Sequence, residues 1–158
     1  PHVSRGADVT SHSESKVVPY TADLMFQVVA DVEKYPEFLP WVSALHIVSR
    51  EQVKGRDILK AHMTVGFKSF RESYTSRVNL DPAGRTIDVV QTDGPFRILE
   101  NHWRFTPEGE NCKIDFTIQF EFRNPLLNMV AGAAFGRVLL RTTDAFLDRA
   151  RKLSKKFA

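Results

Sequence analysis

Cysteine is nearly absent from this sequence, and its scarcity excludes disulfide bonds within the chain. The 158 residues contain a single cysteine, Cys112, so no disulfide can form within the chain. Because disulfides belong to oxidising compartments, a reducing compartment is expected. Cys112 opens an apolar run with no base nearby in the pattern, which predicts a core thiol rather than a nucleophile.

Long hydrophobic runs are also missing. The longest charge-free apolar run lies near residues 126–136 and is too short to span a bilayer. The opening PHVSRGADVTSHSESK is polar and lacks the apolar core of a signal peptide. We therefore expect a disordered lead-in at 1–12 and one domain at 13–158. The expected location is the bacterial cytoplasm, with peripheral contact at the inner membrane, or the mitochondrial inner membrane if the source is eukaryotic.

Charge and motifs exclude several functions. The net charge of +3 permits an anionic phospholipid or RNA partner but does not require one. Basic residues gather near the C-terminus, which fits either a solvated helix end or a membrane or ribosome contact. The histidines are scattered, and neither a glycine-rich phosphate loop nor a G-x-S-x-G elbow is present. The sequence predicts no metal site, no catalytic cofactor, no DNA partner and no enzymatic activity.

Turn signals divide the middle of the chain into six apolar runs. They fall at 53–56, 65–68, 81–84, 93–95 and 106–111, and each places Gly, Pro, Asp or Asn at the end of a run. Between Cys112 and Phe122, apolar and polar residues alternate with a period of two, which predicts a strand with one buried face. This spacing indicates an antiparallel meander.

Two helices are expected to bracket the meander. The first runs from about Ala22 to Lys34 with Thr21 as N-cap, and the second runs from about Pro125 to Lys156 without a proline to interrupt it. One more strand is expected before the first helix. The predicted fold class is α+β, a helix-grip domain in which a seven-stranded antiparallel sheet wraps around a long C-terminal helix. Such a fold leaves space for an apolar ligand between sheet and helix.

Two polar residues interrupt the predicted inner face of the sheet. Alternation places Glu72 and Ser76 on the face of Tyr74, and Asn101 on the face of Trp103. Glu72 and Asn101 are interpreted either as members of internal polar pairs or as anchors for a ligand head group. A register slip would instead place either residue in water.

Two segments are unusually apolar for their positions. The first half of the long helix, 126–140, is apolar nearly all round, so it is either exposed as a binding surface or covered by a loop or a second copy. The stretch EKYPEFLPW, 33–41, is stiffened by Pro36 and Pro40. It is predicted either to close the cavity as a lid, with Phe38 and Leu39 on the first half of the long helix, or to plug the end of the core.

The run VVADVEKYPEFLPWV at 28–42 closely resembles the motif of the coenzyme Q-binding START-domain family, which also includes ribosome association toxins. Further matching pieces lie at 61–67, 72–76, 94–96, 99–105 and 120–122, and the resemblance covers about 13–152. At position 42 this chain has Val where the family usually has a cysteine or a similar small residue. The resemblance implies a START or Bet v 1-like helix-grip fold, a lipophilic tunnel and binding of ubiquinone without a catalytic cofactor.

Three functions follow as hypotheses. The first is a chaperone for a polyprenyl quinone or another lipid that supports respiration. The second is an interaction protein that blocks association of the ribosomal subunits. The third is a polyketide cyclase or dehydratase, for which only Glu72 would qualify as acid or base. The candidate ligand-binding residues are Phe38, Leu39, Trp41, Phe67, Phe70, Glu72, Tyr74, Asn101, Trp103, Phe105, Phe116, Met129, Phe135 and Leu139.

Overall fold

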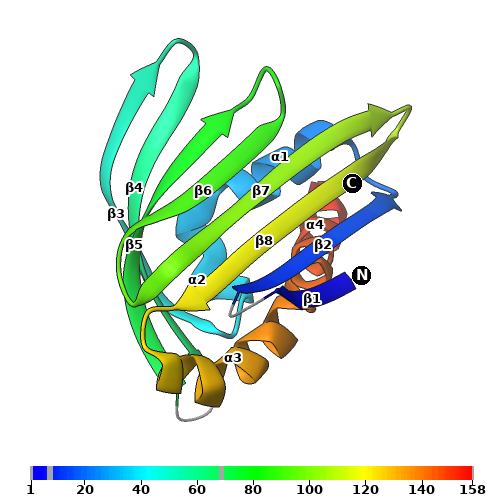
Figure 1. Cartoon of the computed structure of the whole chain (residues 1–158). Helices are drawn as coiled ribbons and strands as arrows, with labels where there is room; N and C mark the ends of the chain where they lie inside the picture. The colour runs from blue at the N-terminus through cyan, green and yellow to red at the C-terminus, as the bar shows by residue number, and fades with distance from the viewer. Residues whose placement is uncertain (1, 7–8, 68–69, 158) are drawn as a thin grey trace.

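An eight-stranded antiparallel sheet curves around helices in the computed structural model, which describes residues 2–6, 9–67 and 70–157 (Figure 1). The strands are β1 (His2–Gly6), β2 (Val9–Val18), β3 (Val42–Val53), β4 (Arg56–Phe67), β5 (Phe70–Asp81), β6 (Thr86–Asp93), β7 (Phe96–Glu108) and β8 (Asn111–Phe122). Their order in the sheet is β1-β2-β8-β7-β6-β5-β4-β3. The predicted helix-grip fold is confirmed, with β2 to β8 as its seven strands and β1 as a further strand at the edge.

The lead-in predicted at 1–12 differs from the structure, which places β1 and the start of β2 there. The backbone of β2 pairs with β8 from Thr10 to Val18. The inward side chains of β2 are polar in this region, so the sequence carried no apolar alternation to reveal a strand.

The predicted helix at 22–34 is divided into two pieces, and a separate short helix follows it. Helix α1 (Ala22–Ala30) begins at the predicted cap, where the Thr21 hydroxyl accepts a hydrogen bond from the Leu24 N–H at 3.2 Å. A 3₁₀ turn, η1 (Val32–Lys34), and the short helix α2 (Tyr35–Phe38) follow. Pro36 lies in the first turn of α2, where a proline is tolerated, so it favours the start of a new helix there rather than a continuous one.

The predicted long C-terminal helix is two helices, α3 (Pro125–Leu139) and α4 (Thr142–Phe157). Asn124 caps α3 as predicted, accepting a hydrogen bond from the Leu126 N–H at 2.9 Å. No proline marks the break. Two β-branched residues with low helix propensity follow it, Thr142 and Thr143, and the second of them is held by a strand. Helix α4 then packs on α1, whereas α3 crosses one end of the sheet (Figure 1).

The core lies between the curved sheet and the helices. Rings from β7, β8 and α3 form its most crowded part, where Phe96, Phe120 and Phe122 surround Phe135. Cys112 is fully buried, as predicted, and burial raises the pKa of its thiol. Within the described residues, no helix is long and apolar enough to cross a membrane.

Candidate ligand-binding site

A cavity of about 110 Å³ lies inside the grip, between the sheet and the helices. Its walls come from β3 to β8 on one side and from η1, α2, α3 and α4 on the other. Seven of the predicted site residues line it: Leu39, Trp41, Tyr74, Asn101, Trp103, Phe116 and Phe135. Strand alternation in the sequence had placed four of them, Tyr74, Asn101, Trp103 and Phe116, on the inner face of the sheet.

The glycine at the β6–β7 turn fixes one part of this wall. A Cβ on Gly94 would lie 2.5 Å from the Cβ of Tyr74, which no side chain tolerates. Because glycine stands here, the turn can close directly over Tyr74. Tyr74 also packs edge-on against Phe96 at 5.5 Å between ring centroids, so its ring is held at the cavity by the turn and by the core.

Asn101 does two things in the structure. It lines the cavity, and its Oδ1 accepts a hydrogen bond from Trp103 Nε1 at 3.2 Å. The two residues are two apart on β7 and therefore share one face. Trp103 in turn lies 4.1 Å from Phe116 and 5.3 Å from Phe146, measured between ring centroids, so Asn101 orients an indole that joins sheet and helix α4.

Among the described residues, the side chains that line the cavity are hydrocarbon, hydroxyl, amide, indole and thioether groups. Burial raises the pKa of both tyrosines in the wall, Tyr35 and Tyr74, and nearby Asp31 adds to the effect at Tyr35. Both phenols are therefore neutral at physiological pH. Across residues 2–6, 9–67 and 70–157, no three His, Cys, Asp or Glu side chains are placed to hold a metal ion.

Five predicted site residues do not line the cavity. Glu72 is half-buried on the inner face of β5, nearer the strand end than Tyr74, and it lies opposite Val65. Glu72 does not line this cavity, because the strand extends beyond it, and its role as an anchor for a ligand stays a prediction. Ser76, on the same face, lines the cavity instead.

Two aromatic residues among these five, Phe105 and Phe70, pack behind the wall. Phe105 is buried and stacks 6.0 Å from Trp103, away from the cavity. Phe70 packs at 5.6 Å from Phe122 and 6.5 Å from Phe135 in the neighbouring core. Both distances are between ring centroids. These rings shape the cavity without lining it.

The structure separates the two residues of the predicted lid. Leu39 is buried at the cavity, but Phe38 lies on α4, with its ring centroid 5.4 Å from Phe146 and 5.0 Å from the guanidinium carbon of Arg149. The prediction that Phe38 contacts the first half of the C-terminal helix is therefore wrong. The break after α3 explains the error, because α4 rather than α3 lies against α2.

The last predicted positions lie on α3 and at the end of β4. Met129 is 74% exposed and points away from the cavity, because it lies on the outer face of α3. Phe67 and Leu139 belong to β4 and α3, but their side chains lie outside the described part of the structure. Their proposed contact with a ligand stays a prediction.

Sequence reasoning did not select two buried hydroxyls that line the cavity. Ser76 Oγ and Thr142 Oγ1 have no hydrogen-bond partner within the described residues. A buried polar group left unpaired costs about 1–3 kcal/mol. Alternation had placed Ser76 on the inner face, whereas nothing in the sequence indicated Thr142, which was expected in the middle of a helix.

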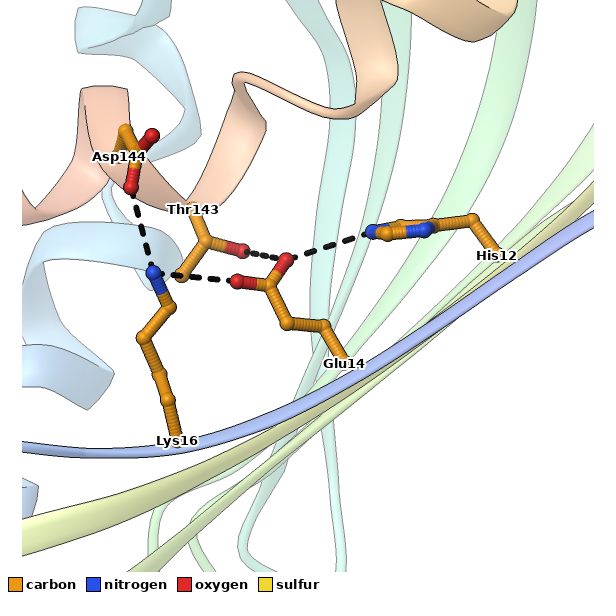
Figure 2. Close-up of polar contacts among 5 residues, drawn as sticks. All are labelled: His12, Glu14, Lys16, Thr143 and Asp144. Atoms are coloured by element: carbon orange, nitrogen blue, oxygen red, sulfur yellow. Dashed lines mark hydrogen bonds and ion pairs between the residues drawn. The ribbon is translucent and has the colours of Figure 1, made fainter. Parts of the chain in front are cut away.

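Five polar side chains form a cluster that holds the start of α4 against β2 (Figure 2). The Thr143 hydroxyl donates to Glu14 Oε2 at 3.0 Å, and Lys16 Nζ bridges Glu14 Oε1 at 3.1 Å and Asp144 Oδ1 at 3.2 Å. His12 Nε2 lies 3.3 Å from Glu14 Oε2. This cluster sets the position of α4 and hence of Thr142 in the cavity wall.

The Glu14 carboxylate in this cluster makes the stability of the protein depend on pH. Burial alone would raise the pKa of Glu14, but hydrogen bonds from Lys16 and Thr143 and the charge of Lys16 outweigh it and lower the pKa. Because the pKa of Glu14 is lower in the folded protein than its unfolded value of 4.5, the ionised carboxylate stabilises the fold at pH values above 4.5. This stabilisation is lost as the pH falls through the pKa of the folded state.

Glu14→Gln is therefore expected to reduce the free energy of unfolding at pH 7 by about 2 kcal/mol. The deficit should shrink below pH 4.5, where the wild-type carboxylate protonates. Urea unfolding at several pH values measures both. Glu110→Gln, at an exposed site, is the matched control. Equal stabilities of wild type and Glu14→Gln at pH 7 would contradict this account.

A family model described as polyketide cyclase/dehydrase and lipid transport matches residues 18–147. The chain belongs to this family. Within it, the chain is 34% identical over 145 residues to the ribosome association toxin RatA of Pseudomonas aeruginosa, covering 91% of this chain and 97% of that protein. It is 31% identical over 153 residues to the mitochondrial coenzyme Q-binding protein COQ10 homolog B of Xenopus laevis, covering 94% of this chain and 61% of that one.

Among solved structures, an 18 kDa protein of Caulobacter crescentus matches with a TM-score of 0.76 and 36% identity, over 92% of this chain and 98% of that chain. The family match reaches from β2 into α4 and so spans every strand that lines the cavity. The resemblance drawn from the 28–42 motif is confirmed at the level of the family.

Proposed function

We propose that this protein binds a lipophilic ligand, most simply a polyprenyl quinone such as ubiquinone, between its sheet and its C-terminal helices. The apolar cavity carries the proposal. Its lining offers mainly hydrocarbon, and burial of apolar surface is worth about 25 cal/mol per Å². The similarity to a protein named for coenzyme Q binding supports the choice of ligand.

The neutral lining favours binding over cyclase chemistry. A cyclase or dehydratase needs a group that takes up and releases a proton near neutral pH. The titratable groups in the described wall are two phenols whose pKa burial has raised. Glu72, the acid that the enzyme hypothesis required, lies outside the cavity. A chaperone role, in which the ligand is held and passed on unchanged, fits these groups better.

Tryptophan fluorescence offers a direct test, because both tryptophans of the chain, Trp41 and Trp103, line the cavity. A quinone bound there would quench both. Titration with a ubiquinone that carries a ten-carbon tail is expected to give saturable quenching at one ligand per chain. Quenching that only rises linearly, as for free tryptophan, would argue against the proposal.

We further propose that α3 brings the protein to an anionic membrane surface, from which the ligand enters. Leu126, Met129 and Val130 are 62%, 74% and 71% exposed on the outer face of α3. The segment 123–143 contains Arg123, Arg137 and Arg141 and no acidic residue. Apolar side chains on a helix with flanking cations suit the interface of an anionic bilayer.

A ribosomal partner is the second candidate function. It is favoured by the relatives named RatA, one of which matches over 97% of its own length. The basic residues of α4 would form the contact, although Arg151 and Lys152 already pair with Asp148. Cosedimentation with ribosomes at low salt, lost steeply as salt rises, is the expected result for this function. Absence of cosedimentation at low salt would count against it.

A further inference from the structure

We propose that Ser76 and Thr142 form a polar subsite that binds the oxygen-bearing head group of a neutral ligand inside the cavity. The inference rests on the proposed lipid-binding function and specifies which part of the ligand lies where. Its basis is the pair of unpartnered hydroxyls in a wall that is otherwise mostly hydrocarbon.

The two hydroxyls are buried and come from opposite walls. Ser76 is 3% exposed on β5, on the sheet side, and Thr142 is 8% exposed at the start of α4, on the helix side. Within the described residues neither oxygen has a hydrogen-bond partner. Buried polar side chains normally have a hydrogen-bond partner, and acceptor oxygens supplied by a ligand would give one to each of the two hydroxyls.

The start of α4 adds a preference for an acceptor oxygen. The first N–H groups of a helix lack partners within it, and the helix dipole is positive at that end. The Thr143 hydroxyl already donates a hydrogen bond to Glu14, whereas Thr142 lines the cavity. A carbonyl oxygen with partial negative charge therefore suits the position of Thr142.

The head group is expected to be neutral. The described lining contains no Lys or Arg, so a buried carboxylate or phosphate would lose its hydration without gaining a counter-ion. A ring with two carbonyls, as in a para-quinone, would offer one acceptor to each wall. A hydrocarbon of the same size would offer none, and a fatty-acid anion would be disfavoured.

The test compares two probes: a ubiquinone with a ten-carbon tail, and an alkylbenzene with the same tail. Quinone binding is read from tryptophan quenching, and alkylbenzene binding from displacement of the quinone. Ser76→Ala and Thr142→Val are each expected to weaken quinone binding about five- to tenfold, and to leave alkylbenzene binding unchanged or tighter. Thr142→Ser should keep quinone binding, and Thr117→Val, on the exposed face of β8, should change neither.

Thermal unfolding without ligand gives an independent readout. Each variant removes an unpartnered buried hydroxyl, so Tm should stay the same or rise by about 2–4 °C. Unchanged quinone affinity in both variants would overturn the subsite, as would an equal loss for quinone and alkylbenzene. Wild-type protein that binds neither probe would overturn the proposed function itself, whereas one that binds both equally well would overturn only the subsite.

Discussion

Ala61→Phe is expected to lower the affinity for a quinone at least tenfold. Ala61 is 4% exposed and lines the cavity from β4, so a phenyl ring there would project into the space of the ligand. A ring added at the wall of this cavity of about 110 Å³ would take up space that the ligand needs. The measurement is the tryptophan-quenching titration with the ten-carbon-tail quinone.

Ala44→Phe is the matched control. Ala44 lies on β3, the strand beside Ala61, and its side chain is exposed. Overpacking a filled core costs about 1–3 kcal/mol, but here the new ring enters existing space, so the free energy of unfolding should fall less. Ala61→Phe protein that is folded and binds quinone as tightly as Ala44→Phe would contradict the assignment of the cavity.

The double substitution Met129→Asp/Val130→Asp is expected to weaken binding to anionic vesicles about 30-fold or more. Full burial of a Met or Val side chain is worth about 1.5–3 kcal/mol, and the bilayer interface would provide part of it. Two carboxylates would also repel anionic headgroups. Flotation with vesicles of phosphatidylcholine and phosphatidylserine measures the loss.

The control for this pair is Val48→Asp/Val53→Asp. Both valines are exposed on β3, 53% and 45%, so the control adds the same charge away from α3. The control should bind vesicles nearly as well as wild type. Wild-type binding should also fall with salt, because each arginine near an anionic surface contributes about 1 kcal/mol. Equal flotation of the two double variants would contradict the docking of α3.

The Ala61→Phe variant and the Met129→Asp/Val130→Asp variant separate quinone binding in the cavity from docking on the membrane. Ala61→Phe should reduce quinone binding but leave vesicle flotation intact, because α3 keeps its outer face. Met129→Asp/Val130→Asp should keep quinone binding in detergent, because Met129 and Val130 are exposed and do not line the cavity. If either variant impaired both activities equally, entry from the membrane and binding in the cavity would not be separate steps.

Period-two alternation predicted the sheet and half of the site. Strands β7 and β8 bury one face almost without exception, so Asn101, Trp103 and Phe116 could be placed at the cavity from sequence. Alternation says which face a residue occupies but not how far along the strand the cavity extends. It therefore could not show that Ser76 lines the cavity and Glu72 does not, because both lie on the same face of β5.

Tertiary contacts determine two features that the sequence pattern did not reveal, the break between α3 and α4 and the strand β2. The break before Thr142 has no proline or glycine at the junction, and the Thr143 hydroxyl is held by Glu14 from the far end of the chain. The inward side of β2 is Thr10, His12 and Glu14, a polar pattern that resembles a disordered segment. Backbone pairing of β2 with β8 on one side and with β1 on the other makes these residues part of the sheet.

The outer face of α3 was predicted as one of two alternatives. Apolar residues all round 126–140 meant either an exposed surface or a covered one, and helical periodicity cannot distinguish them. In the structure no described loop of the chain covers Leu126, Met129 and Val130, whereas cover by a second copy stays a prediction. What the sequence could not provide was the direction of α3, which depends on the break at 140–141.

The central claim is that the cavity holds a lipophilic ligand, and organic extraction of the purified protein followed by mass spectrometry tests it most directly. Wild-type protein, purified without detergent from cells that make polyprenyl quinones, is expected to yield a quinone in near-equimolar amount. Ala61→Phe protein purified in parallel should yield less than a tenth of it. Wild-type protein that yields no lipophilic compound, and takes up none from quinone-loaded vesicles, would contradict the account.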